Sequence, residues 1–251
     1  MLYCGQVWSG GGVTMGNAGF FDFVEGLAHY DGLNQPVARL NKRHAFVIDA
    51  FKDQIAGARV LDLASHDGRW CYAFAGAGAA SVLGIEARQE LVDEYAQYPE
   101  TDFKSKVTLR CDDLYDGMEA EVKSGQTYDV IGVLGILYHV MDHFRLFQLA
   151  RKLKPKLIIV DSEFMLRDGP MIQLVRERTD NILNAAPQVE GQEVAIKGVP
   201  SFAAMEVIAD VLGYDVLWSD WDSLPKGKRG GVGDYFREAK MRRATCALVP
   251  R

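Results

Sequence analysis

Two short apolar runs, each ending in an acid, constrain the fold of this chain more than any other feature. The first, Val60–Leu63, has Asp62 near its end and leads into the small-residue turn Ala64–Gly68. The second covers residues 81–85 and ends at Glu86. Their separation is that of one strand–helix–strand unit. The pattern predicts a parallel sheet with a cleft for a nucleoside-bearing cofactor beyond its strand ends.

The composition is that of a globular chain with one core. Its 251 residues are 48% hydrophobic and 25% charged, and the formal net charge of −6 provides no broad footprint for nucleic acid. The cysteines form no C-x-x-C pair, which disfavours a zinc knuckle or disulfide framework and favours a reducing cytoplasm. No apolar run approaches the roughly 18–20 residues of a membrane span, and no secretory signal is evident.

The chain divides into an extension and a single folded domain. Residues 1–15 lack periodicity and are expected to form a disordered extension. Within the domain of residues 16–251, we expect a helical lid over 16–57, a cofactor-binding core over 58–165, and a substrate-side insertion with closing strands over 166–251. The lid is predicted to consist of two helices, over 17–30 and over 39–56.

Strands and helices are predicted to alternate throughout the core. The short apolar strands favour an α/β fold in which helices cover both faces of a parallel sheet. The expected strands are 59–63, 81–85, 107–111, 129–134 and 156–161. The helices between them are expected over 69–77, 89–98, 118–122 and 142–153.

The C-terminal third departs from this alternation. We expect a helical stretch over 171–183 and a helix from Ser201, its N-cap, to Leu212. Two final strands are expected over 214–218 and 244–249. A loop at 225–243 separates them and is rich in glycine and basic residues.

Each of the first three expected strands ends in an acid, and together these acids suit a nucleoside. Small residues after Asp62 let a ligand approach the backbone, and the following helix offers free N–H groups. Glu86 can accept hydrogen bonds from both ribose hydroxyls, and Asp112 or Asp113 can accept one from an exocyclic amine such as that of adenine. A nicotinamide dinucleotide fits less well, since the chain lacks the G-x-G-x-x-G turn and this alternative leaves Asp112 unexplained.

As a set, these motifs resemble those of the class I S-adenosylmethionine-dependent methyltransferases. The similarity covers about residues 40–165 and the closing strands, and includes Tyr128–Gly135 as the fourth strand with its exit loop. It implies a three-layer Rossmann-like sandwich, mostly parallel with an antiparallel last strand, and S-adenosylmethionine as cofactor with S-adenosylhomocysteine as product. The implied cofactor-binding residues are Asp62, Ala64, Ser65, His66, Gly68, Glu86, Asp112, Asp113, Leu114 and Gly135.

The turn after the first strand departs from the family pattern. Ala64 and His66 stand where glycines are usual, and only Gly68 is retained. We therefore expect the backbone to avoid strongly positive φ at Ala64 and His66. His66 is expected to point its side chain into or over the cofactor site.

The exit loop after the fourth strand carries the candidate catalytic residues. In the family it lies beside the transferred methyl group, so His139 is the leading candidate for general base toward a hydroxyl acceptor. His143, four residues on, would share a helical face with it. The short Gly-x-Leu-Tyr-His segment also resembles the tRNA wobble-uridine carboxymethyltransferase branch.

The sequence leaves three hypotheses about the function open. An aromatic pocket of Phe20, Phe21, Tyr30 and Phe164 favours a small organic or sugar-like acceptor methylated at a hydroxyl. A tRNA-modifying enzyme is the second hypothesis, and it would need a continuous basic face from Arg43 to the loop at 226–243. The simpler interpretation is a solvent-facing stripe on the N-terminal helix, made of Arg39, Lys42, Arg43 and His44. A non-catalytic module that only binds S-adenosylmethionine is the third hypothesis.

A divalent metal is a further alternative that we do not favour. His139, His143, Asp161 and Glu163 could supply nitrogen and oxygen ligands, but their spacing defines no full ligand set. No membrane partner is expected. The sequence leaves the acceptor, the methylated atom and the oligomeric state open.

Overall fold

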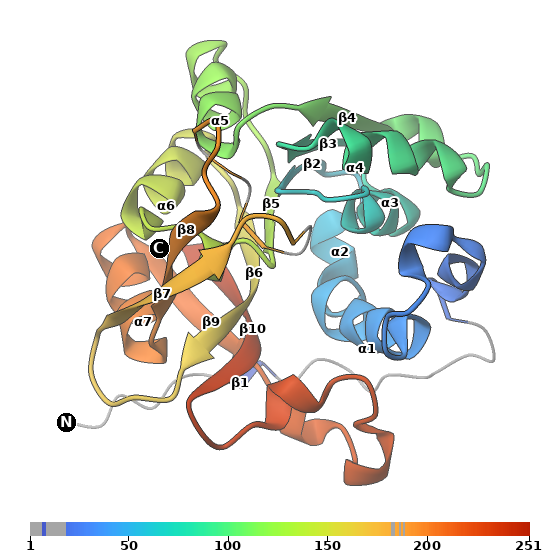
Figure 1. Ribbon diagram of the computed structural model, residues 1–251. Coiled ribbons are helices and arrows are strands. Elements are labelled where there is room, and N and C mark those ends of the chain that lie inside the picture. Colours follow the sequence, from blue (N-terminus) through green and yellow to red (C-terminus); the bar gives the residue numbers. More distant parts are fainter. Residues whose placement is uncertain (1–6, 9–18, 182–183, 186, 188) are drawn as a thin grey trace.

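The architecture is an eight-stranded sheet between layers of helix (Figure 1). The computed structural model describes residues 7–8, 19–181, 184–185, 187 and 189–251. The sheet has the order β1-β9-β10-β6-β5-β2-β3-β4. Its strands are β1 (Val7–Trp8), β2 (Arg59–Leu63), β3 (Ser81–Glu86), β4 (Val107–Cys111), β5 (Val130–Leu134), β6 (Leu157–Met165), β9 (Tyr214–Ser219) and β10 (Met241–Pro250).

The predicted sheet is confirmed, including the direction of its last strand. Strands β2 to β6 pair in parallel, and β10 lies between β6 and β9 antiparallel to both. The order reverses at β2, whose neighbours are β3 on one side and β5 on the other. In an open α/β sheet such a switch point opens a crevice at the carboxyl ends of the strands.

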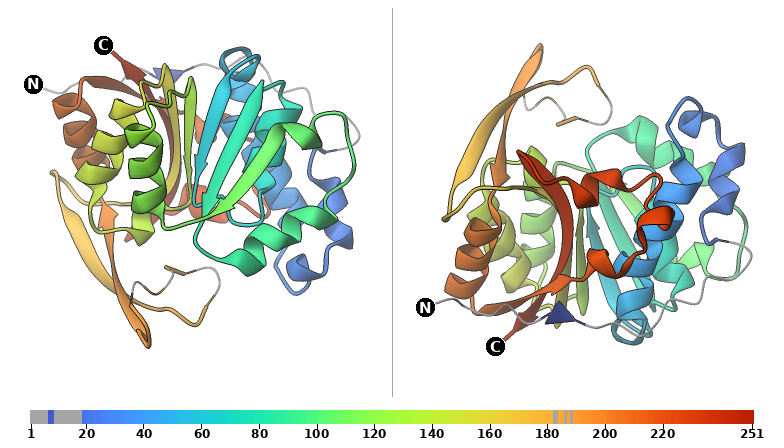
Figure 2. Two further views of the ribbon diagram at one scale, coloured as in Figure 1. Left: turned by 90° about the horizontal axis from the view of Figure 1, so that it is seen from above. Right: turned by 90° about the horizontal axis from the view of Figure 1, so that it is seen from below.

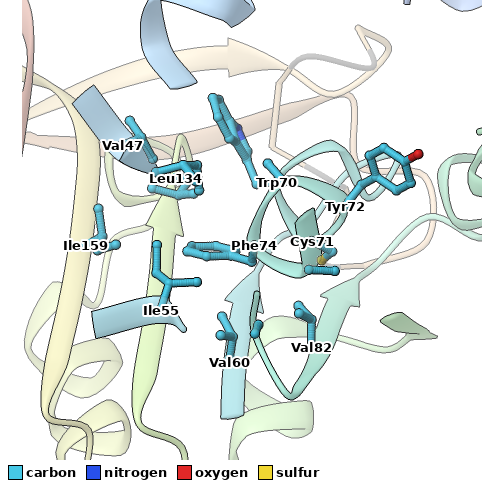
Figure 3. Packing of buried hydrophobic residues seen from close by; sticks show 14 of the residues in the cluster. Val47, Ile55, Val60, Trp70, Cys71, Tyr72, Phe74, Val82, Leu134 and Ile159 are labelled. Atoms are coloured by element: carbon cyan, nitrogen blue, oxygen red, sulfur yellow. The ribbon is translucent and has the colours of Figure 1, made fainter. Parts of the chain in front are cut away.

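The sheet lies between two layers of helix (Figure 2), and an apolar core fills the space on each of its faces. In one core, the lid and α3 (Arg69–Gly76) pack on one face of the sheet. Phe74, Val60 and Ile159 all belong to this cluster (Figure 3). The other packs α5 (Leu114–Lys123), α6 (His143–Lys152) and α7 (Phe202–Val211) on the opposite face. Because both faces are covered, the central strands are almost continuously buried. Helix α4 (Gln89–Glu94) connects β3 to β4.

The lid is more broken than predicted. Two 3₁₀ turns, Asp22–Gly26 and Ala28–Tyr30, replace the expected helix over 17–30. The reason is that the buried side chains of this segment recur every three residues, at 21, 24, 27 and 30, which is the 3₁₀ period. The second expected helix divides into α1 (Pro36–Val47), a 3₁₀ turn and α2 (Lys52–Ile55).

The predicted helix over 171–183 is wrong, because this segment begins as a strand. Strands β7 (Ile172–Arg178) and β8 (Val194–Pro200) form a separate antiparallel ribbon. Side chains alternate across it: Glu177 is buried toward the body of the protein, whereas Leu174 is exposed. The pairing partner lies about twenty residues further along the chain, so a local pattern could not reveal it.

Two further predictions concern the start of α7 and residues 1–15. Ser201 caps α7 as predicted, accepting a hydrogen bond from Ala204 N. Val7–Trp8 of the predicted disordered extension form a strand that pairs in parallel with β9, and the rest of residues 1–15 lies outside the described residues. Among the helices that the structure describes, none combines the length and apolar character needed to cross a membrane.

Candidate active site

A cleft of about 930 Å³ lies at the carboxyl ends of the parallel strands. Its walls come from helix α1, the turn after β2, the exit of β5 and the loop that joins the two strands of the ribbon. Asp62, Gly68 and His143 do not line it. The predicted site residues that do are Ala64, Ser65, His66, Glu86, Asp112, Asp113, Leu114, Gly135 and His139.

The expectation that Ala64 and His66 avoid positive φ is wrong. Their φ angles are 54° and 56°, so both adopt the left-handed conformation that glycine usually supplies. The conformation is held by backbone hydrogen bonds from Ser65 N to Ile85 O and from His66 N to Glu86 Oε2. The turn therefore adopts a left-handed backbone at two positions without glycine, at a cost of about 1–2 kcal/mol per residue.

His66 is held at the wall of the cleft by charged neighbours. Its Nδ1 contacts the Arg69 guanidinium, and Arg69 Nε donates to Asp67 Oδ1 at 2.7 Å. Burial, followed by the nearby Arg69 charge, lowers the pKa of His66. The ring is thus a neutral part of the turn at pH 7, and it is tied to Arg69.

Asp67 connects this turn to the lid. It is fully buried, and its Oδ2 accepts from Tyr30 Oη at 2.6 Å and lies 2.8 Å from His29 Nε2. Burial alone would raise the pKa of Asp67, but Arg69 and the His29 contact outweigh it and hold the pKa well below its usual range. Asp67 therefore stays ionised and fixes the lid against the turn after β2.

Asp62 lies behind the cleft rather than in its wall. Its side chain is buried, with Cys71 Sγ 3.3 Å from Oδ2. Burial raises the pKa of Asp62 to about 7. The residue can act on a ligand through the backbone it supports, but not by direct contact with the cleft.

Glu86, Asp112 and Asp113 lie along one edge of the cleft. Glu86 accepts a backbone hydrogen bond on each carboxylate oxygen, from His66 N on Oε2 and from Arg88 N on Oε1. Asp113 caps α5 through Tyr115 N and Asp116 N. Asp112 is partly exposed and lies 3.5 Å from Arg110 Nε. Unlike that of Asp113, its carboxylate accepts no helix-capping hydrogen bonds from the described residues and is free to accept one from a ligand.

His139 forms a dyad that the sequence did not reveal. Its Nδ1 lies 2.7 Å from Glu177 Oε2, on strand β7 of the ribbon. Glu177 also accepts from Lys197 Nζ at 2.5 Å and from Ala185 N. Burial alone would raise the pKa of Glu177, but the hydrogen bonds from His139 and Lys197 lower it to about 2. An ionised carboxylate thus orients the imidazole.

His143 is separated from His139 in both structure and environment. His139 ends a 3₁₀ turn and His143 begins α6, so the prediction of a shared helical face is wrong. The His143 side chain is buried, with Nε2 2.9 Å from Gly198 O. Burial lowers its pKa. This histidine connects α6 to the ribbon.

A second buried carboxylate, Asp161, organises the other side of the cleft. Its Oδ1 accepts from Arg43 Nη2 at 2.8 Å and from Arg243 Nη1 at 2.5 Å, and its Oδ2 accepts from Tyr235 and Thr245. Burial alone would raise the pKa of Asp161, but the two arginines outweigh it and hold the pKa well below its usual range.

This cluster corrects the expectation for Arg43 and also shows what holds the residues of the metal alternative. Arg43 is not part of a solvent-facing stripe, since it is buried against Asp161 and Trp70. The four suggested metal ligands have other partners: Asp161 binds arginines, Glu163 lies 3.2 Å from Arg237, and the histidines are held by the ribbon. The described residues contain no group of three His, Cys, Asp or Glu placed to hold a metal ion.

The expected aromatic pocket is not formed. Phe20 and Phe21 pack into the core around Trp70, and Phe164 packs against Trp218, so only Tyr30 of the four predicted aromatics reaches the cleft. The face expected for tRNA is interrupted as well. Arg43 and Arg243 are buried, whereas Lys226 and Lys228 are exposed.

No protein-family model and no curated protein matches the chain. Solved structures do. The N-terminal domain of EvdMO1, solved in the presence of SAH and D-fucose, is 18% identical with a TM-score of 0.62, over 85% of this chain and 83% of that one. In the complete EvdMO1 structure the match spans 40% of that chain.

Two bacterial proteins described as S-adenosylmethionine-dependent methyltransferases also have similar structures. The putative enzyme from Listeria monocytogenes is 13% identical, with a TM-score of 0.55 over 85% of this chain and 99% of its own. The enzyme from Mesorhizobium loti is 16% identical, with a TM-score of 0.50 over 77% and 92%. The predicted fold of the class I methyltransferases is thereby confirmed.

Proposed function

We propose that this chain is an S-adenosylmethionine-dependent methyltransferase acting on a hydroxyl of a small organic or sugar-like acceptor. The observation that carries the proposal is the dyad of His139 with Glu177 at the exit of β5, in the wall of the cleft. A carboxylate on Nδ1 keeps the proton on that nitrogen. Nε2 is then the basic atom available to an acceptor.

The residues of the cleft fit the cofactor. Each Glu86 oxygen has one backbone donor and retains a lone pair, which suits the two ribose hydroxyls. Ala64 and Gly135 leave little side-chain bulk where the backbone lines the cleft. Leu114 offers an apolar surface beside the partly exposed Asp112, as an adenine ring with its amine requires.

S-adenosylmethionine, when bound, supplies an electrophilic methyl group on a sulfonium sulfur. The chain contributes position and proton transfer. The lid and the turn after β2, joined through Asp67, hold the walls of the cleft together, and alignment of the reacting atoms is the larger part of catalysis. His139 Nε2 takes the hydroxyl proton, and the Glu177 charge stabilises the resulting imidazolium.

The class of acceptor is supported by a neighbour and by the cleft. The EvdMO1 domain was crystallised with D-fucose, a small sugar. In this chain the substrate side is bounded by α1, by Arg243 on β10, and by Asn184, Ala185 and Pro187, which leaves a cleft of small-molecule size.

Calorimetric titration with S-adenosylhomocysteine, S-adenosylmethionine and NAD tests the cofactor. We expect the two adenosyl compounds to bind and NAD not to bind. Glu86→Ala should weaken S-adenosylhomocysteine binding about 10–100-fold by removing the ribose acceptor. Glu90→Ala, an exposed acid on α4, is the matched control. Binding of NAD alone would overturn the proposal.

Methyl transfer is tested by release of S-adenosylhomocysteine with a panel of hydroxyl and amine acceptors that includes D-fucose. We expect turnover with a hydroxyl compound and a roughly 10²–10⁴-fold lower kcat in His139→Ala, with cofactor affinity unchanged. A His139→Ala protein that behaves like the wild type would contradict the role of the base and favour a module that only binds the cofactor.

A further inference from the structure

The substrate side of the cleft contains a buried excess of positive charge. Arg43 and Arg243 share the single carboxylate of Asp161, and their side chains are 9% and 7% exposed. Both arginines line the cleft, whereas Asp161 is fully buried beneath them. Since Asp161 can balance only one of them, one guanidinium charge has no partner in this pair of contacts.

The neighbouring charged groups do not remove the excess. Arg39 forms a two-pronged ion pair with Asp234, with both distances 2.7 Å, and that pair is neutral by itself. Arg243 Nε lies 3.3 Å from Asp234 Oδ2 but makes no hydrogen bond to the residues that the structure describes. The connected group therefore has three guanidinium groups and two carboxylates.

Other polar groups facing these arginines are neutral or already paired. The hydroxyls of Tyr235 and Thr245 donate to Asp161, and burial raises the pKa of Tyr235, so it is a neutral phenol. Lys197 is paired with Glu177. A buried charge without a partner is costly, and an anionic ligand at these arginines would offset that cost.

The excess charge lies beside the proposed base. Arg243 Nη2 donates to Tyr138 Oη at 3.0 Å, and Tyr138 precedes His139 in the same 3₁₀ turn. Arg43, Arg243 and His139 also line the same cleft, so one molecule can place an anionic group on the arginines and a hydroxyl at His139. Arginine suits this task, because its planar donors match carboxylate and phosphate oxygens.

We propose that the acceptor carries an anionic group, a carboxylate or a phosphate, that binds Arg43 and Arg243. This inference rests on the proposed function, since it names the acceptor class of that site. The ion completes the charge balance of the buried cluster and orients the acceptor hydroxyl toward His139. A neutral analogue of the same size should bind more weakly.

Small anions test the site without knowledge of the acceptor. Inorganic phosphate and acetate are titrated into the protein saturated with S-adenosylhomocysteine, and binding is followed by calorimetry. We expect saturable binding that weakens about ten-fold or more in Arg43→Gln, because that variant removes the excess charge. The relative affinity of the two ions distinguishes a phosphate acceptor from a carboxylate acceptor.

A variant of opposite sign makes the test independent of folding defects. Asp234→Asn raises the excess charge and should tighten phosphate binding, which a merely damaged protein would not do. Arg178→Gln, which breaks an exposed pair with Asp180, should leave binding unchanged. Anion binding that is absent in the wild type, or insensitive to Arg43→Gln and Asp234→Asn, would overturn the proposal.

The remaining alternative is that the arginines hold the carboxylate of the cofactor itself. In that case Arg43→Gln would weaken S-adenosylhomocysteine but not 5′-methylthioadenosine, which lacks the amino-acid part, and this outcome overturns the acceptor assignment. We expect both affinities to stay within two-fold of the wild type. If neither adenosyl compound binds wild-type protein, the proposed function fails, whereas Arg43-dependent phosphate binding would still establish the anion site.

Discussion

The two halves of the cleft are built in different ways. The half assigned to the cofactor comes from the ends of neighbouring strands, and its main residues fall between Ala64 and Leu114. It is edged with acids. The half assigned to the acceptor joins residues as distant in sequence as Arg43 and Arg243, and its buried cluster carries excess positive charge. A site encoded by local segments can be found in a sequence, whereas a site assembled across the fold cannot.

The two halves also differ in the source of their unfavourable free energy. The cofactor half places Ala64 and His66 in left-handed backbone. Both halves bury ionised groups, Asp67 in one and Asp161 in the other, but in the acceptor half two arginines share one carboxylate, and their desolvation must be offset by good geometry. Substitutions at the left-handed residues Ala64 and His66 should therefore have smaller effects on stability than substitutions in the arginine cluster.

The largest effect is expected for Asp161→Asn. Removing this charge leaves the buried Arg43 without a carboxylate and leaves Arg243 only its 3.3 Å contact with Asp234, which should lower the free energy of unfolding by about 3–5 kcal/mol. Urea denaturation measures it, with Asp180→Asn at an exposed pair as control. A loss below 1 kcal/mol would show that the acceptor half is not held by buried charge.

Glu177→Gln should come next, with kcat about 10²-fold lower and S-adenosylhomocysteine affinity unchanged. The variant removes the charge that fixes the tautomer of His139, so Glu177 acts as a positioning residue. Nitrogen NMR of the imidazole should show the proton on Nδ1 in the wild type and a mixed population in the variant. An unchanged tautomer would contradict this role.

Asp62 should give the cofactor half a distinctive dependence on pH. Because its pKa is raised to about 7, the folded state binds a proton that the unfolded state releases near pH 4. Its contribution to stability is therefore present at low pH and is lost as pH rises toward 7. Between pH 5 and 8 the wild type should lose about 2 kcal/mol more than Asp62→Asn. Parallel pH profiles of urea midpoints would contradict the raised pKa.

Ala64→Gly should produce the smallest change, and in the stabilising direction. Glycine relieves the left-handed strain at φ 54° at some cost in unfolded-state entropy, so we expect a gain of about 0.5–1 kcal/mol. Thermal unfolding measures it, with Ala87→Gly as a control at another cleft position where φ is not positive. Destabilisation would show that the Ala64 methyl contributes packing that outweighs strain.

The sequence predicted most of the sheet and much of the cofactor half because both depend on local patterns. The strand that contains Asp62 and the strand that ends at Glu86 follow from apolar runs, and their parallel neighbours bring the acids to one edge. The backbone at Ala64 and His66 was mispredicted, because residue type alone does not show that hydrogen bonds from this turn hold a left-handed conformation.

The acceptor half depends on pairings that no local pattern contains. Glu177 was hidden in a segment interpreted as helix, whose strand character arises from its pairing with residues 194–200. The local sequence around Arg43 predicts an exposed basic stripe. Its partner Asp161 is 118 residues away, so the local pattern does not show that Arg43 is buried. The aromatic residues near the N-terminus, interpreted as a pocket, instead fill the core below the lid.

The convergence of donors on Asp161 also sets an order of events during synthesis. Its four partners include Arg43, near the beginning of the chain, and Thr245, close to the end. On a ribosome, the strands of the cofactor half can pair once residue 111 has emerged, but this carboxylate must wait until β10 is released. Until then, the strand-end half of the cleft is nearly complete in the nascent chain, whereas the half that contains Arg43 and Arg243 is unfinished.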